Sequence, residues 1–159
     1  MEEIYEVLGT TGELTDSQKK KLMSLEILTE KENIIPIPRM VNRIRSLRES
    51  GKRVVFISDM YFDSSTIRGF LARVDSSFQD IPLYVSNEYG FTKNSGNLYS
   101  IVKDIEKVSF KDWIHIGDNL YSDVQKAKSL GINAQHFEFS KLTAYELDLL
   151  REYGNFPEV

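Results

Sequence analysis

The alternation of short apolar runs with helical stretches from residue 53 onward constrains the fold of this chain most strongly. The apolar runs span 53–57, 82–86, 112–116 and 133–138. The stretches with helical periodicity that follow them span 64–74, 97–108, 119–130 and 142–151. Strands and helices that alternate at this spacing need crossover connections, which build a parallel sheet with helices on both faces. We therefore predict an α/β fold.

The first 33 residues carry helical patterns but no residues arranged for chemistry. A short helix is predicted at 3–8, and a longer one begins at Asp16. Either Thr15 or Asp16 can accept hydrogen bonds from the free backbone N–H groups at the start of the longer helix. We treat 1–33 as a separate helical segment.

An apolar linker at 34–38 interrupts the helical pattern before the α/β region begins. Pro38 suits the first position of a helix because that position needs no N–H donor. This helix is expected to end at Gly51, since glycine commonly terminates helices. The second unit, the α/β core, accordingly spans 34–159.

Composition excludes several classes of function. The 159 residues carry a net charge of -4, which does not suit a surface that neutralises nucleic-acid phosphates. Cysteine is absent, and the two histidines, His115 and His136, cannot form a zinc site alone. No apolar stretch reaches about 20 residues and no leader-like segment opens the chain, so we expect a cytoplasmic protein without membrane contact.

The stretch HIGDNLYSD, residues 115–123, places two carboxylates after a predicted strand. Asp118 and Asp123 lie where ligands bind in parallel sheets, outside the carboxyl ends of the strands. Magnesium prefers oxygen ligands, so these two side chains predict a Mg²⁺ site, with Asn119 able to brace it. Alternatively, Asp118 only caps the next helix and Asp123 is a solvated acid in its first turn.

Two further polar residues occupy comparable positions earlier in the chain. Ser58 ends the strand at 53–57 and could donate its hydroxyl to a phosphoryl oxygen, whereas Lys93 offers a positive charge for the same group. Serines at strand ends and surface lysines are common, so neither residue is informative alone. Their order is more specific, because Ser58, Lys93 and Asp118 follow successive strands and are expected to converge.

The strings SDMYF, YVSNEYGFTKNSGNLY and HIGDNLYSDV resemble the haloacid dehalogenase (HAD) superfamily, in the branch often joined to glycosyltransferases. The resemblance covers about residues 39–138. It implies a three-layer Rossmann-like core and Mg²⁺-dependent phosphate-monoester hydrolysis, with a sugar phosphate as a suggested substrate. It also implies site roles. The catalytic residues would be Ser58 and Lys93, the substrate-binding residues Ser58, Asp59, Lys93 and Asn119, and the metal ligands Asp118 and Asp123.

One motif of that family is absent from the sequence. HAD phosphatases open with a strand that ends in Asp-x-Asp, in which the first aspartate attacks phosphorus and the second serves as acid and base. No Asp-x-Asp occurs here, and residues 1–33 resemble the end of a helical cap. We therefore expect a family member that lacks its first part, as a fragment, a split protein or a degenerate copy, and that is incomplete or inactive alone.

The missing strand of the family lies between the strands that end here at Ser58 and Gly117. An empty position there leaves backbone groups unpaired, so self-association or binding of a complementing chain is expected. A non-catalytic partner or pseudoenzyme is the alternative function.

A different alignment would make the strand at 53–57 the nucleophile strand. Asp59 would then attack, Tyr61 would occupy the acid/base position and Ser86 would follow as the second motif. The lysine would be Lys103 or Lys107, which lie in the body of a predicted helix rather than at its start. Asp59 is therefore expected to be a loop residue beside the site.

A phospho-acceptor receiver domain also places aspartate, serine and lysine at strand ends, here Asp59, Ser86 and Lys107. Receivers need an acidic pair after the first strand, but Glu2 and Glu3 precede every predicted strand. That interpretation also leaves GDNLYSD unexplained.

The remaining candidates have simpler interpretations. His115 alternates with Trp113 along a strand, so we expect a packed core histidine rather than a base. Tyr61 and Tyr89 are expected to pack over the end of the sheet or in the core, with walls of a substrate pocket as the alternative.

Overall fold

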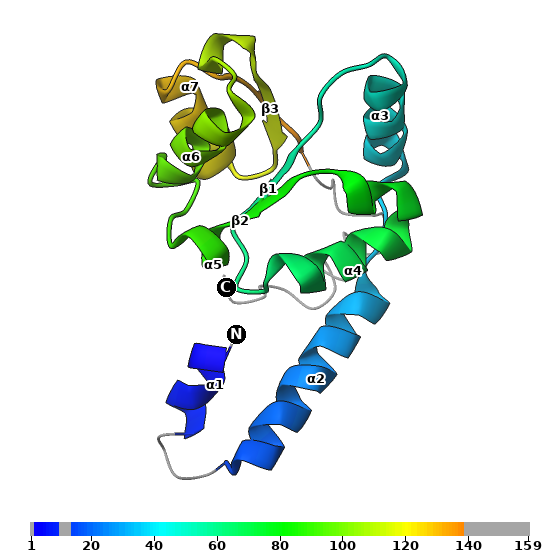
Figure 1. Ribbon diagram of the computed structural model, residues 1–159, viewed down its shortest axis with the longest axis vertical. Coiled ribbons are helices and arrows are strands. Elements are labelled where there is room, and N and C mark those ends of the chain that lie inside the picture. The colour runs from blue at the N-terminus through cyan, green and yellow to red at the C-terminus, as the bar shows by residue number, and fades with distance from the viewer. Residues whose placement is uncertain (1, 10–13, 139–159) are drawn as a thin grey trace, which may run out of the picture.

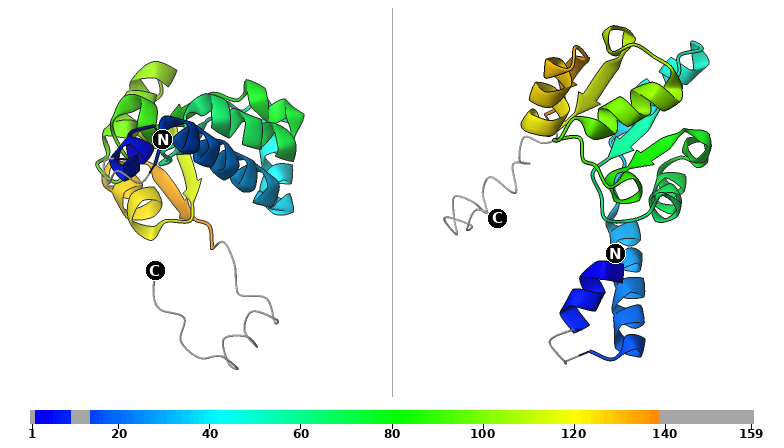
Figure 2. Two further views of the ribbon diagram at one scale, coloured as in Figure 1. Left: turned by 90° about the horizontal axis from the view of Figure 1, so that it is seen from below. Right: turned by 60° about the vertical axis from the view of Figure 1, so that its left-hand side comes forward.

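The computed structural model describes residues 2–9 and 14–138, which form a mixed α/β structure (Figure 1). A helical arm consisting of α1 (Glu2–Gly9) and α2 (Asp16–Asn33) projects from a body that holds all the described strands (Figures 1 and 2). No helix in this part of the chain combines the length and apolarity of a membrane span. The helix predicted at 142–151 lies outside the described residues.

The start of α2 is fixed by reciprocal hydrogen bonds around Thr15, one of the two residues predicted to cap this helix. The Thr15 hydroxyl oxygen accepts from the backbone N–H of Gln18, and the Gln18 side chain accepts from the backbone N–H of Thr15. Near its other end α2 meets the body, where the Tyr61 hydroxyl donates to Glu26 over 2.7 Å and Ile27 packs against a core cluster. The arm is thus anchored at one end.

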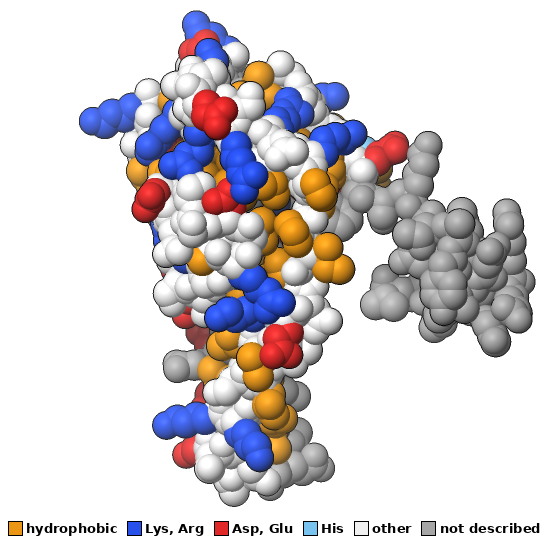
Figure 3. Space-filling model, turned by 90° about the vertical axis from the view of Figure 1, so that its right-hand side faces the viewer, with side chains coloured by type: hydrophobic (Ala, Val, Ile, Leu, Met, Phe, Trp, Pro, Cys, Tyr) orange, Lys and Arg blue, Asp and Glu red, His pale blue; other side chains and the backbone are white. Residues whose placement is uncertain are grey.

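Along its length, α2 buries no side chain completely. Figure 3 shows hydrophobic side chains along one side of the arm. The exposed leucines of α2 are Leu22, Leu25 and Leu28.

Two helices of the body match their sequence-based predictions closely. Pro38 is the first residue of α3 (Pro38–Glu49), and α4 (Ser64–Val74) begins after Asp63, whose carboxylate accepts from the backbone N–H of Thr66. That bond lowers the pKa of Asp63 and satisfies an N–H at the helix start.

The strands form two parallel pairs rather than one continuous sheet. One pair joins β1 (Phe56–Ser58) to β2 (Leu83–Val85), and the other joins β3 (Ile114–Gly117) to β4 (Asn133–His136). Parallel pairing confirms the prediction, although the strands are shorter than the apolar runs. Within the described residues, β1 and β3 are not hydrogen-bonded to each other.

The segment after β2 differs from the prediction. Ser86 was expected to end a strand but begins the short helix α5 (Ser86–Tyr89), which ends at Gly90 with φ +69°. After a loop, α6 (Asn97–Glu106) starts at the predicted residue but stops at Lys107, which has φ 54°.

The predicted helix at 119–130 is irregular. Its first part, η3 (Leu120–Lys126), is a π-helix, and only α7 (Ala127–Ser129) is α-helical. Short 3₁₀-helices, η1 (Ser76–Asp80) and η2 (Phe110–Asp112), precede β2 and β3. π-Helical turns are rare and frequently occur at functional sites.

Each strand pair has its own apolar core. Phe62, Phe70 and Val85 belong to the cluster beside β1 and β2. Tyr99, Ala127, Ile132 and Ala134 form the cluster beside β3 and β4. Ile57 of β1 packs against the second cluster, so the two halves of the body touch across β1.

Candidate functional site

The carboxyl ends of β1 and β3 are joined by Lys93, which lies in the loop before α6. Its backbone N–H donates to the Asp59 carboxylate over 2.9 Å, and its ammonium Nζ lies 2.6 Å from Oδ1 of Asp123. Asp59 directly follows β1, whereas Asp123 belongs to η3 after β3. The three loops meet, but the residues that Lys93 contacts are Asp59 and Asp123, not Ser58 and Asp118, for which the convergence was predicted.

Asp123 is the most enclosed charged group of the site, with 1% of its surface exposed. Its Oδ1 also lies 3.1 Å from Nε2 of His115, and its Oδ2 accepts from the backbone N–H of Asn119. Burial raises the pKa of the Asp123 carboxyl, but the hydrogen bonds from His115 and Lys93 outweigh burial and hold it well below its usual range. Asp123 is therefore ionised at neutral pH.

Two buried residues complete this network. The Tyr99 hydroxyl donates to the carbonyl of Ser122 over 3.0 Å and lies 3.0 Å from Nε2 of His115. Burial raises the pKa of the Tyr99 hydroxyl, and the negative charge of Asp123 raises it further. The hydroxyl therefore stays neutral. His115 is buried as predicted, but it also contacts Asp123, a contact that the strand alternation did not indicate.

Gly117 is required by the position of Asp123. A Cβ atom on Gly117 would collide with the carboxylate group of Asp123. The glycine at the end of β3 therefore lets η3 fold its carboxylate back against the strand.

Asp118 and Asn119 have different surroundings. The Asp118 carboxylate is exposed and has no hydrogen-bond partner among the described residues, while its carbonyl oxygen lies 2.8 Å from Nε2 of His136. The Asn119 side-chain oxygen accepts from the backbone N–H groups of Tyr121 and Ser122 and so caps η3. The expected capping at this helix start is performed by Asn119 rather than Asp118.

The other sequence-predicted residues lie in less constrained positions. Ser58 is half-buried at the end of β1, next to Asp59. The Ser86 hydroxyl lies 3.4 Å from the carbonyl of Met60. The ammonium of Lys103 lies 3.3 Å from the Asp104 carboxylate, and Lys107 follows the last residue of α6. The lysine whose ammonium contacts Asp123 is Lys93.

An open hollow of about 330 Å³ adjoins Asp59. Its lining comes from the segments that follow β1 and β2 and includes Tyr61, Asn87 and Phe91, all of which are exposed. Tyr89, the alternative second wall of such a pocket, lies outside this lining, and its ring centroid is 6.1 Å from that of Tyr84.

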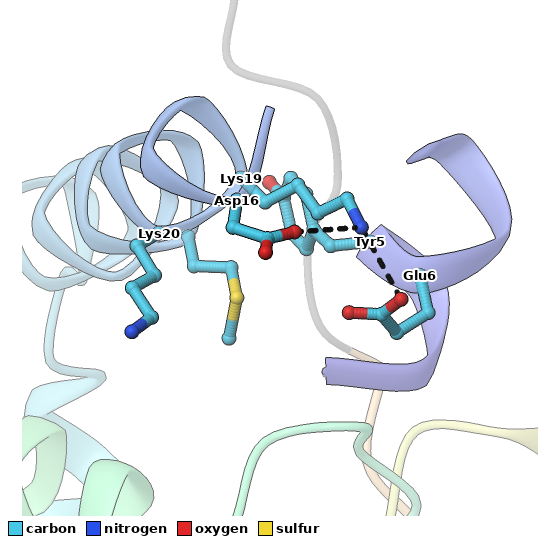
Figure 4. Close-up of a pocket in the computed structure, with 6 residues that line it drawn as sticks. Tyr5, Glu6, Asp16, Lys19 and Lys20 are labelled. Carbon is cyan, nitrogen blue, oxygen red and sulfur yellow. Dashed lines mark hydrogen bonds and ion pairs between the residues drawn. The ribbon is translucent and has the colours of Figure 1, made fainter. Parts of the chain in front are cut away.

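A second hollow, of about 430 Å³, lies between α1 and α2 (Figure 4). The ammonium of Lys19 lies 3.2 Å from Glu6 and 3.4 Å from Asp16, so its charge is balanced by carboxylates. This hollow is separate from the strand ends and shares no residue with the Lys93 network.

The side chains at this site offer carboxylate oxygens, the type of ligand that Mg²⁺ prefers. Asp118 offers an unengaged carboxylate, and Asp123 offers oxygens that can accept further bonds. Within residues 2–9 and 14–138, no group of three or more His, Asp or Glu side chains is placed to hold a metal. Magnesium needs only one or two carboxylates, because water and a phosphate complete its shell.

Comparison of the chain with protein-family models and with curated proteins found no match.

Proposed function

We propose that this chain is a HAD-like hydrolase domain of the Mg²⁺-dependent phosphate-monoester type, with a three-layer Rossmann-like core and a remnant of a helical cap at 1–33. It would be incomplete or inactive alone because it carries no Asp-x-Asp. The supporting observation is the network at the strand ends, in which Lys93 bridges Asp59 and the buried Asp123.

Each group has a role in this proposal. Asp118 and Asp123 would hold Mg²⁺, which supplies positive charge against a phosphoryl group. Lys93 keeps Asp123 ionised and presents its own charge at the same edge, and the Ser58 hydroxyl would donate to a phosphoryl oxygen. His115 and Tyr99 position Asp123 from the buried side.

The hollow beside Asp59 suits the remainder of a substrate. The rings of Tyr61 and Phe91 offer apolar faces, and Asn87 offers both donors and acceptors. A sugar phosphate, the class suggested by the sequence resemblance, combines apolar C–H faces with hydroxyl groups and would use all three.

Hydrolysis of p-nitrophenyl phosphate by the purified chain with Mg²⁺ tests this proposal. We expect no turnover above the rate without protein. Turnover that Asp59→Asn abolishes, but Asp112→Asn does not, would contradict it and make Asp59 the nucleophile. Asp112 is a suitable control because its exposed side chain lies in η2, outside the network.

A non-catalytic role as a binding partner, or as one half of a split enzyme, is the second candidate. The observation that favours it is the division of the strands into two parallel pairs. A body whose two halves lack a shared ladder gains stability when another segment joins them.

A further inference from the structure

One side of helix α2 carries a regular row of four exposed residues. Lys21, Leu25, Leu28 and Glu32 are spaced by four, three and four positions. Because an α-helix has about 3.6 residues per turn, this spacing places the four side chains, called the α2 row below, in one line along the axis. Leu25 and Leu28, in the middle of the row, are 47% and 49% exposed. Hydrophobic side chains are visible along one side of the arm in Figure 3.

The other side of α2 is the one that holds the arm together. The ammonium of Lys19 contacts Glu6 of α1 (Figure 4), the Tyr5 hydroxyl donates to Glu26 over 2.8 Å, and Ile27 packs against the core cluster beside β1 and β2. Positions 19, 26 and 27 lie roughly 130–150° around the helix from the centre of the α2 row. These contacts therefore leave the row at the surface.

The two charges of the α2 row are not explained by the stability of α2 itself. Lys21 lies in the first half of the helix and Glu32 in its last turn, whereas the helix dipole favours acidic side chains at the start and basic ones at the end. Within residues 2–9 and 14–138, neither side chain takes part in an ion pair. Both charges are thus available to a partner.

The α2 row is complementary to itself when its direction is reversed. If a second α2 lies antiparallel to the first, with Leu25 of each helix opposite Leu28 of the other, then Lys21 of each lies opposite Glu32 of the other. A parallel neighbour would instead bring lysine to lysine and glutamate to glutamate, which repel. A surface that matches a second copy of itself in this way is what a two-fold interface requires.

We infer that two copies of this chain associate through the α2 row, with their α2 helices antiparallel about a two-fold axis. Leu25 and Leu28 form the apolar centre of the contact, and a Lys21–Glu32 ion pair closes it at each end. The alternation of four and three positions is the spacing at which two helices pack side chains between one another. This surface is separate from the strands, and the inference does not depend on the proposed phosphate chemistry.

Charge and size indicate the kind of contact. Helix α2 contains four lysines and four acidic residues and so has no net charge, which does not suit an anionic lipid surface. Its 18 residues span only about 27 Å, so one pair of helices buries less surface than a permanent dimer needs. We therefore expect a reversible dimer that forms at micromolar concentrations.

Sedimentation velocity of the full 159-residue chain, between about 1 and 500 µM, tests the inference. The monomer should convert to a dimer as concentration rises, without larger species. Lys21→Glu and Glu32→Lys should each raise the Kd about tenfold, because the two-fold axis turns one substitution into two like-charge contacts. The chain with both substitutions should regain a Kd close to the natural one, since opposite charges meet again.

Lys20→Glu is the matched control. Lys20 is also exposed and makes the same charge change, but it lies about 100° around the helix from Lys21 and outside the α2 row. Its Kd should stay within about twofold of the natural value. Recovery in the chain with both substitutions also shows that neither change acts by unfolding α2.

Three results would overturn the inference. A chain that stays monomeric over the whole concentration range has no such dimer. Equal Kd values for Lys21→Glu and Lys20→Glu would place the association on another surface, such as the strand edges. Failure of the second substitution to restore association would exclude the antiparallel arrangement. Hydrolysis and Mg²⁺-binding assays have no bearing on these results.

Discussion

The ammonium nitrogen of Lys93 lies 2.6 Å from Oδ1 of Asp123, and the two side chains are 12% and 2% exposed. The pair joins the loop before α6 to η3, and the backbone of Lys93 extends the connection to Asp59 after β1. One lysine therefore connects the ends of both strand pairs.

Removing the charge of Asp123 should destabilise the fold strongly. Asp123→Asn leaves the Lys93 ammonium buried without its counter-charge, and breaking such a pair costs about 3–5 kcal/mol. Urea unfolding would measure the loss. The control Asp112→Asn, at an exposed position, should change the free energy of unfolding by less than about 0.5 kcal/mol. Similar values for the two variants would contradict the importance of the pair.

The contribution of Asp123 should depend on pH in a defined direction. Its folded-state pKa is depressed, so its stabilising effect is complete above the ordinary aspartate value of about 3.9 and is lost as pH falls toward the folded value. The difference in unfolding free energy between the natural chain and Asp123→Asn should therefore shrink as pH falls below about pH 4. A difference that does not change below this pH would show that the carboxylate charge is unimportant.

A methyl group at Gly117 should displace Asp123. In Gly117→Ala, the new Cβ would meet the carboxylate group, so η3 must shift and the contact with Lys93 should weaken. We expect a loss of about 1–3 kcal/mol, in the range of other overpacked sites. Gly69→Ala is the control, because no atom lies within 4 Å of its Cβ position and it sits inside α4. There, alanine should stabilise by about 0.5–1 kcal/mol. Two equally stable variants would contradict the close approach of Asp123.

The cap of α2 should contribute to the helical arm. Thr15→Ala removes the side-chain oxygen that accepts from Gln18, and such caps contribute about 1 kcal/mol. Faster amide exchange near Gln18 and lower helix content by circular dichroism would report the loss. Ser24→Ala is matched within α2, where the serine hydroxyl only donates to a backbone carbonyl one turn earlier, and it should not weaken the helix. Identical exchange in both variants would contradict a role for the cap.

Local signals explain the elements that were predicted well. Helices α2, α3 and α4 begin where Thr15, Pro38 and Asp63 place a cap or a first-turn proline, and such signals act within a few residues. The parallel direction of the strands followed from their spacing, since helical crossovers require it.

Other features depend on contacts that sequence spacing does not reveal. The π-helical pitch of η3 is not encoded in its apolar pattern, which also suits an α-helix. Tyr99 was not singled out, because its hydrogen bond to Ser122 joins residues 23 positions apart through the core. Ser86 continues the apolar run of β2, yet the left-handed Gly90 allows a short helix to close there.

The order of the site residues along the chain was predictable, but the contacts between their side chains were not. Lys93 and the aspartates follow successive predicted strands in the sequence, which predicted that their loops converge. The sequence could not show that Lys93 pairs with Asp123 and that Asp118 keeps a free carboxylate, because both depend on the fold of η3.

Calorimetric titration of the full chain with Mg²⁺, with and without inorganic phosphate, tests the proposed function most directly. We expect Mg²⁺ to bind, phosphate to bind more tightly when Mg²⁺ is present, Asp118→Asn to reduce Mg²⁺ affinity at least tenfold and Asp112→Asn to leave it unchanged. Absence of Mg²⁺ binding, or equal affinities for the natural chain and Asp118→Asn, would contradict a metal and phosphate site at the ends of β1 and β3.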